Sequence, residues 1–314
     1  MQDGFYESVL KLKTIQKHPQ HHSNQFHEFL DDYRNIIELC KSGKSVSQVS
    51  EIEAVNLLNN MKLTVSDVYS ITPSHYLNAG PVGWKHYQHL LNRLLCQVEN
   101  TTISEVNTAY AIILFKGHGK DRSSSKSYRT ISTCPVVAKG LDMFIRDQFK
   151  ESWNESQADT QFQGNGSSHE LAALLLSECI QFSRKCLKKP TFVLYLDAKS
   201  AFDVVRTEAL LRKLYFLKQE PDNLLLHVDD RLSHRQTVVD WNSHLMGPIN
   251  DELGLEQGGI NSSEFYKIFG KEQLQLAQKS ELGVRMRNVT ISAIGQADDT
   301  VLVSNSIFAP QSSP

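Results

Sequence analysis

The chain lacks most of the features that would place it in a membrane or outside the cell. Its 314 residues contain no run of about eighteen apolar residues, the length that spans a bilayer, and no secretory signal pattern. Its five cysteines are odd in number and show no paired spacing typical of a metal site, which predicts free thiols in a reducing compartment. We therefore expect an intracellular chain, in the nucleus or cytoplasm, with no membrane partner.

Charge of one sign is not in excess either, because 33 Lys and Arg residues oppose 35 Asp and Glu residues, for a formal net charge of −2. Any surface that binds nucleic acid is therefore expected to be local, and its affinity modest. The hydrophobic content of 40% is sufficient for a sizeable core, in one large domain or two smaller ones.

Carboxylates follow two strand-like segments of the sequence. Asp197 ends an apolar run, 191–196, that is rich in β-branched and aromatic residues, as in a buried strand. Asp298 and Asp299 lie between the apolar runs 289–294 and 300–303, which predicts a hairpin with both aspartates at its tip.

Three carboxylates held close together repel one another, and their partial desolvation adds to the penalty unless a cation compensates. Oxygen ligands of this kind suit Mg²⁺, which binds a few carboxylates together with substrate phosphates. Two such ions catalyse phosphoryl transfer by activating an attacking hydroxyl and stabilising the leaving group. An isolated Asp-Asp pair is more often a solvated turn, so the other motifs of the chain decide between the two interpretations.

A basic segment follows a second strand pattern, 111–115. Gly117, Gly119 and the serines 123–125 predict the turn of a hairpin, and the segment carries cations on both sides of that turn. Arg129 and Lys116 are the candidates for binding a triphosphate, Arg129 first, because Arg binds phosphate as a fork and Lys as a point charge. A charged loop of this kind is otherwise simply solvated.

Five blocks of the sequence resemble motifs of the reverse transcriptases carried by non-LTR (LINE-like) retrotransposons, and they follow one another along the chain in the order of that family. Residues 196–203 (LDAKSAFD) resemble the first palm motif, 255–262 (LEQGGINS) the Gln-Gly segment before a palm helix, and 296–299 (QADD) the aromatic-Ala-Asp-Asp box. Residues 128–132 (YRTIS) resemble the fingers segment Tyr-Arg-Pro-Ile-Ser, and 161–169 more weakly resemble the Gln-Phe-Gly-Phe stretch.

The resemblance implies an α+β fold of the reverse-transcriptase type, with fingers and a palm made of a small antiparallel sheet backed by helices. Residues 1–105 are expected to form a mostly helical region that supports the fingers, and 106–190 the fingers and a pre-palm helix. Residues 191–305 are expected to form part of the palm, and 306–314 a disordered tail. A complete relative continues into a thumb, which we expect to be absent because the sequence ends shortly after Ser304.

The resemblance also implies a role for each matching residue. Asp197, Asp298 and Asp299 would be the catalytic metal ligands, with two Mg²⁺ ions as cofactors and Mn²⁺ as a substitute. Phe202 would lie beneath the deoxyribose of the incoming nucleotide. Gln257 and Gly258 would approach the templating base pair, since glycine permits close contact. The implied partners are an RNA template, a DNA primer and deoxynucleoside triphosphates.

Three positions depart from the family pattern. Gln296 replaces the usual aromatic residue, Thr130 replaces a proline, and Asn165 lies where Phe-Arg is usual. An alternative hypothesis is therefore a catalytically inactive retroelement remnant that at most binds RNA weakly and without specificity. A third, an RNA-dependent RNA polymerase with a similar palm, is disfavoured by Phe202, whose ring leaves no room for a 2′-hydroxyl.

Overall fold

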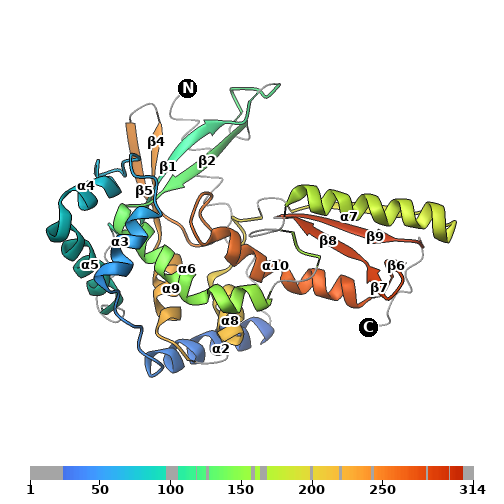
Figure 1. The fold of residues 1–314 in the computed structure, drawn as a ribbon, viewed down its shortest axis with the longest axis horizontal. Coiled ribbons are helices and arrows are strands. Elements are labelled where there is room, and N and C mark those ends of the chain that lie inside the picture. The colour runs from blue at the N-terminus through green and yellow to red at the C-terminus, as the bar shows by residue number, and fades with distance from the viewer. Residues whose placement is uncertain are drawn as a thin grey trace. The chain divides into compact units, whose positions relative to one another are not determined.

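The computed structural model describes residues 24–96, 105–117, 119–124, 127–156, 160–162, 168–198, 201–218, 221–241, 244–280, 282–296 and 298–306 (Figure 1). The chain divides into two compact units. The first contains Met1–Glu151 and Asp203–Ser262, and the second contains Ser152–Phe202 and Ser263–Pro314. No helix in the described ranges is long and apolar enough to cross a membrane.

The first unit is built largely of helices. They are α2 (Asn24–Lys41), α3 (Glu51–Asn59), α4 (Pro73–Asn78), α5 (Gly80–Cys96), the greater part of α6 (Val136–Ser156), α8 (Thr207–Lys218) and α9 (Leu224–Ser233). Their apolar faces supply the core, in which Leu58, Tyr87, Leu91 and Leu210 are fully buried. Helix α3 begins with a reciprocal capping box between Ser50 and Glu53, which satisfies two otherwise free backbone donors.

A four-stranded sheet completes the first unit. The predicted hairpin is present: β1 (Thr108–Phe115) pairs antiparallel with β2 (Tyr128–Thr133). Two strands that we did not predict extend it, so that β4 (Gln236–Trp241) pairs parallel with β1, and β5 (His244–Asn250) pairs antiparallel with β4. The order is β2-β1-β4-β5. Strand β5 carries Gly247 and Pro248, which argue against a strand in sequence but are tolerated at a sheet edge.

Buried polar groups join several elements of the first unit. The guanidinium of Arg231 on α9 donates to both carboxylate oxygens of Asp142 on α6, at 3.0 and 2.9 Å. It also donates to the backbone oxygen of Val106 at 2.7 Å and to Oδ1 of Asn107 at 3.0 Å, just before β1. The side chain of Asn261 donates to the backbone oxygen of Asp142 at 2.9 Å. Arg231 thereby connects two helices with the start of the sheet.

The second unit contains the predicted small antiparallel sheet, in the order β3-β9-β8. Its strands are β3 (Phe192–Asp197), β8 (Ala293–Gln296) and β9 (Asp299–Ser304), and a short hairpin of β6 (Val284–Met286) and β7 (Val289–Ile291) precedes β8. The apolar run 289–294 is thus divided at Ser292 between two sheets. The unit also contains α7 (His169–Phe182), the π-helical turn η2 (Ser183–Leu187) and α10 (Ser262–Lys279), apart from the first residue of α10.

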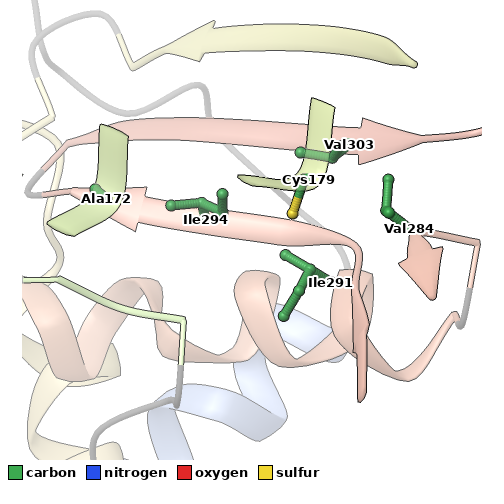
Figure 2. Close-up of a cluster of buried hydrophobic side chains, with 6 residues drawn as sticks. All are labelled: Ala172, Cys179, Val284, Ile291, Ile294 and Val303. Carbon is green, nitrogen blue, oxygen red and sulfur yellow. The ribbon is translucent and has the colours of Figure 1, made fainter. Parts of the chain in front are cut away.

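One face of this sheet packs against α7. Ala172 and Cys179 of α7 meet Ile294 of β8 and Val303 of β9, and Val284 and Ile291 of the short hairpin complete the cluster (Figure 2). Because side chains alternate along a strand, Asp299 lies on the same face of β9 as Val303. The apolar packing therefore fixes the register that places the acidic residues at the sheet end.

Candidate active site

The acidic residues gather at one end of the three-stranded sheet. Asp197 is the last residue of β3 and Asp299 the first of β9, and the two are direct partners in the antiparallel ladder. Asp298 lies in the turn between β8 and β9. Asp197 and Asp299 are exposed and Asp298 is half-buried, so all three carboxylates lie close to solvent. The strand and the hairpin tip thus come together as the sequence predicts.

The carboxylates repel one another. Partial burial and the neighbouring charges of Asp298 and Asp197 raise the pKa of Asp299. In the described ranges, no three or more His, Cys, Asp or Glu side chains are arranged to enclose a metal ion. The donor set nevertheless fits Mg²⁺, because this ion takes one or two carboxylates and completes its shell with water and substrate oxygens.

Phe202 lies in the turn after β3 and is half-buried. Its ring stacks on that of Tyr266 in α10, with 4.9 Å between the centroids and 25° between the planes. Burial and, to a lesser extent, the charge of Asp298 raise the pKa of Tyr266. The sequence analysis missed Tyr266. Its position in the helix that follows the Gln-Gly block is the signal that could have identified it.

Gln296 lies opposite Asp299 in the β8–β9 ladder and therefore on the same face of the sheet. Its Oε1 atom is buried, and no hydrogen-bond partner for it is found among the residues that the structure describes. The residue before it, Gly295, lies against α10, where an added Cβ would come within 2.6 Å of Cδ1 of Leu274. Helix α10 thus packs closely behind the hairpin that carries the two aspartates.

The Gln-Phe block also touches this hairpin. The backbone of Phe162 donates to the oxygen of Gly295 at 2.8 Å, and Gly295 donates to Thr160 at 2.9 Å. The buried side chain of Gln161 donates to the backbone oxygen of Lys267 in α10 at 3.3 Å. Asn165 and the rest of 163–167 lie outside the described residues.

Two further blocks meet within the first unit. The backbone oxygen of Gln257 accepts a hydrogen bond from Ser132 of β2 at 2.9 Å. Gly258 has a φ of 103°, and a Cβ there would lie 3.1 Å from the oxygen of Ser132. Only glycine adopts this conformation readily, and the close approach leaves little room for a side chain. Nearby, the thiol of Cys134 donates to Glu256 at 3.1 Å.

The basic hairpin also belongs to the first unit, whereas the acidic cluster belongs to the second. Arg129 lies on β2 opposite Leu114 and is exposed, as is Lys116 after the end of β1. The backbone of Lys116 donates to Ser127 at 2.8 Å and closes the hairpin. Arg122 lies over the ring of Phe115, 4.9 Å from its centroid. His118, Ser125 and Lys126 lie outside the described residues.

An antiparallel sheet that carries a strand-end aspartate beside an Asp-Asp turn is the arrangement expected of a template-directed polymerase palm. The model of the family described as "Reverse transcriptase (RNA-dependent DNA polymerase)" matches residues 118–309. The chain therefore belongs to the reverse transcriptase family, and the predicted α+β fold of fingers and palm is confirmed.

Among solved structures, the chain is similar to that of apo telomerase from Candida tropicalis truncated from its C-terminal domain, with 11% sequence identity and a TM-score of 0.48. The similarity covers 71% of this chain and 49% of that one, so the chain spans about half the length of its structural relative. A comparison with curated proteins gives no match.

Proposed function

We propose that the chain is an RNA-directed DNA polymerase that joins deoxynucleotides to a primer 3′-hydroxyl by two-metal nucleotidyl transfer. The observation that carries this proposal is the direct pairing of Asp197 with Asp299, beside Asp298, at the end of the palm sheet. These three residues would hold two Mg²⁺ ions, or Mn²⁺ in their place. When bound, such ions activate the attacking hydroxyl and offset charge on the leaving pyrophosphate.

The remaining site residues would position the substrate. Phe202 would lie beneath the deoxyribose, and Arg129 and Lys116 would bind the triphosphate; the exposure of both cations favours this role. Gln257 and Gly258 would approach the templating base pair, which the positive φ of Gly258 favours because it excludes a side chain there. The RNA template, DNA primer and deoxynucleoside triphosphates are the partners in this proposal.

The five sequence blocks support an origin in a non-LTR, LINE-like retroelement, with the nucleus or cytoplasm as the location. They occur in the order of that lineage, from the fingers segment at 128–132 to the Asp-Asp box at 296–299. A phylogeny of these blocks together with reverse transcriptases of other lineages tests the origin. Grouping outside the non-LTR lineage would contradict this origin and leave the proposed chemistry unaffected.

Primer extension tests the activity. The substrate is oligo-dT on poly-rA with Mg²⁺ and labelled dTTP, and the chain is compared with Asp298→Asn/Asp299→Asn, which removes two charges with little change in shape. We expect extension by the parent chain and none by the double variant. Asp147→Asn on the exposed surface of α6 is the matched control and should extend normally. No extension by a folded parent chain, verified by circular dichroism, would refute the proposal.

One observation favours the second candidate, an inactive remnant that binds RNA weakly and without specificity. Gln296 replaces an aromatic residue of the family, and its Oε1 is buried with no hydrogen-bond partner in the described part of the chain. Gln296→Phe distinguishes the candidates. Extension that appears only in this variant would identify the natural chain as an inactivated polymerase. RNA binding by the remnant should weaken steeply as the salt concentration rises and should not depend on RNA sequence.

A further inference from the structure

We propose that Tyr266 is a positioning residue that holds Phe202 in place and thereby contributes to the choice of deoxyribonucleotides over ribonucleotides. The inference rests on the proposed function, in which Phe202 lies beneath the sugar of the incoming nucleotide. Tyr266 would act through Phe202 and need not touch the nucleotide itself.

Phe202 requires support from outside its own segment. It lies in a turn, residues 201–204, rather than in a helix or strand, and it is only half-buried. A ring that excludes a 2′-hydroxyl has to keep both its position and its plane, since the difference between the two sugars is a single oxygen atom. The offset stack on Tyr266, with 4.9 Å between centroids and 25° between planes, supplies this constraint.

Tyr266 is well placed to supply it because α10 is anchored on both sides of this residue. Phe265 is buried and meets Trp153 edge-to-face, with 6.2 Å between the ring centroids. The backbone oxygen of Lys267 accepts a hydrogen bond at 3.3 Å from the buried side chain of Gln161. Further along α10, Leu274 lies directly against Gly295 of the aspartate hairpin. The stack therefore connects the Phe202 turn to a helix packed against the catalytic sheet.

The acidic turn is close to the same pair. Phe202 follows Asp197, the last residue of β3, by five residues, and α10 lies against Gly295 in the hairpin that carries Asp298. A nucleotide whose sugar rested on Phe202 would thus have its triphosphate within reach of the metal-binding carboxylates. This relationship holds within the second unit alone, since Phe202, Tyr266 and Asp298 all belong to it.

Equilibrium binding tests the proposal without requiring catalysis. The chain is loaded with an RNA template and a primer that lacks its 3′-hydroxyl, and the Kd values of dATP and ATP opposite a template uridine are measured with Mg²⁺ present. We expect the parent chain to prefer dATP. In Tyr266→Ala the ratio of the two Kd values should fall about three- to tenfold, the equivalent of one aromatic stack.

Three further variants separate stacking from other effects. Tyr266→Phe keeps the ring and should preserve the parent ratio, whereas Tyr266→Leu keeps the apolar bulk without a ring and should narrow it as Tyr266→Ala does. Phe216→Leu on α8 removes an aromatic contact outside the site, that with Tyr215 at 5.5 Å between ring centroids, and it should leave the ratio unchanged. Tyr266→Leu also replaces Tyr266→Ala should the smaller side chain unfold the chain.

The proposal is overturned when the parent chain binds dATP and ATP equally, when loss of the Tyr266 ring leaves the ratio unchanged, or when Tyr266→Phe narrows it as far as Tyr266→Ala. Parallel extension of an ordinary primer identifies which idea has failed. When the parent chain extends the primer but the ratio of Kd values is the same in Tyr266→Ala as in the parent chain, only the role of Tyr266 is contradicted. A folded parent chain that neither extends the primer nor binds nucleotide contradicts the polymerase function, and it contradicts the role of Tyr266 as well.

Discussion

Asp197 and Asp299 face each other directly across strands β3 and β9, where the other ladder positions pair neutral residues. Like charges directly opposite in a sheet destabilise it. Partial burial, followed by the charges of Asp298 and Asp197, raises the pKa of Asp299. An arrangement that weakens the fold is expected at a site that binds cations, because the bound charge converts repulsion into attraction.

Asp197→Asn should therefore stabilise the metal-free chain and abolish primer extension. Removing one of two opposed charges should add about 0.5 kcal/mol to the free energy of unfolding in EDTA. Thermal melts in EDTA measure the stability, and the primer-extension assay measures the activity. In melts with Mg²⁺ the parent chain should gain stability from the ion and the variant should gain less. Asp147→Asn, at an exposed pair with Arg146, is the control. A variant that melts below the parent chain in EDTA would contradict the repulsion.

The acidic end of the sheet could be predicted because its signals are local. An apolar run that ends in Asp197 and two runs around Asp298 have the period and turn chemistry of a strand and a hairpin. The pairing of β4 with β1 could not be predicted, because a parallel partner more than a hundred residues away leaves no periodicity in either segment. The Gly-Pro pair in β5 actively argued against a strand, and edge position made it acceptable.

The contacts of the candidate site show the same limit. Gly258 was singled out from its motif, but its positive φ and the contact of its loop with Ser132 depend on the folded chain. Tyr266 was missed because its stacking on Phe202 joins a helix to a turn far away in sequence. Sequence identified the residue types that carry chemistry, whereas the residues that hold them in place emerged only from packing.

Arg231→Met should be among the most damaging substitutions in the first unit. It leaves Asp142 buried without its cation, and breaking a buried pair in this way costs about 3–5 kcal/mol. Arg146→Met on α6 is the matched change at an exposed pair with Asp147, and it should alter stability by less than about 0.5 kcal/mol. Urea denaturation of both variants measures the difference. Equal effects would show that the buried pair contributes no more than a surface one.

Two glycine substitutions should change the free energy of unfolding in opposite directions. Gly258→Ala forces a side chain into a positive φ and towards the oxygen of Ser132, so it should destabilise the chain by about 1 kcal/mol or more. Gly270→Ala in α10 meets nothing within 4 Å and should stabilise the chain by about 0.5–1 kcal/mol, through lower unfolded-state entropy and better helix propensity. Denaturation midpoints measure both. A neutral Gly258→Ala would mean that its loop moves freely away from β2.

His227 should make the first unit sensitive to mild acid. Its ring is buried in α9, where Nε2 lies 3.1 Å from the backbone oxygen of Leu95, and burial lowers its pKa from 6.5 to about 4. Between these values the unfolded chain binds a proton that the folded chain does not, so the free energy of unfolding falls as pH falls through this window. The full contribution of the neutral His227 to the free energy of unfolding is present above pH 6.5. Its loss by pH 4 amounts to about 3 kcal/mol at most.

Urea denaturation from pH 4 to pH 7 checks this prediction through the slope of stability against pH. His227→Gln should be less stable at neutral pH but should show a flatter slope, because it has no proton to gain on unfolding. The matched change at the exposed His169, His169→Gln, should keep the parent slope. Identical slopes for His227→Gln and the parent chain would contradict the burial of a neutral imidazole, since all other titratable groups contribute equally to the slope in both proteins.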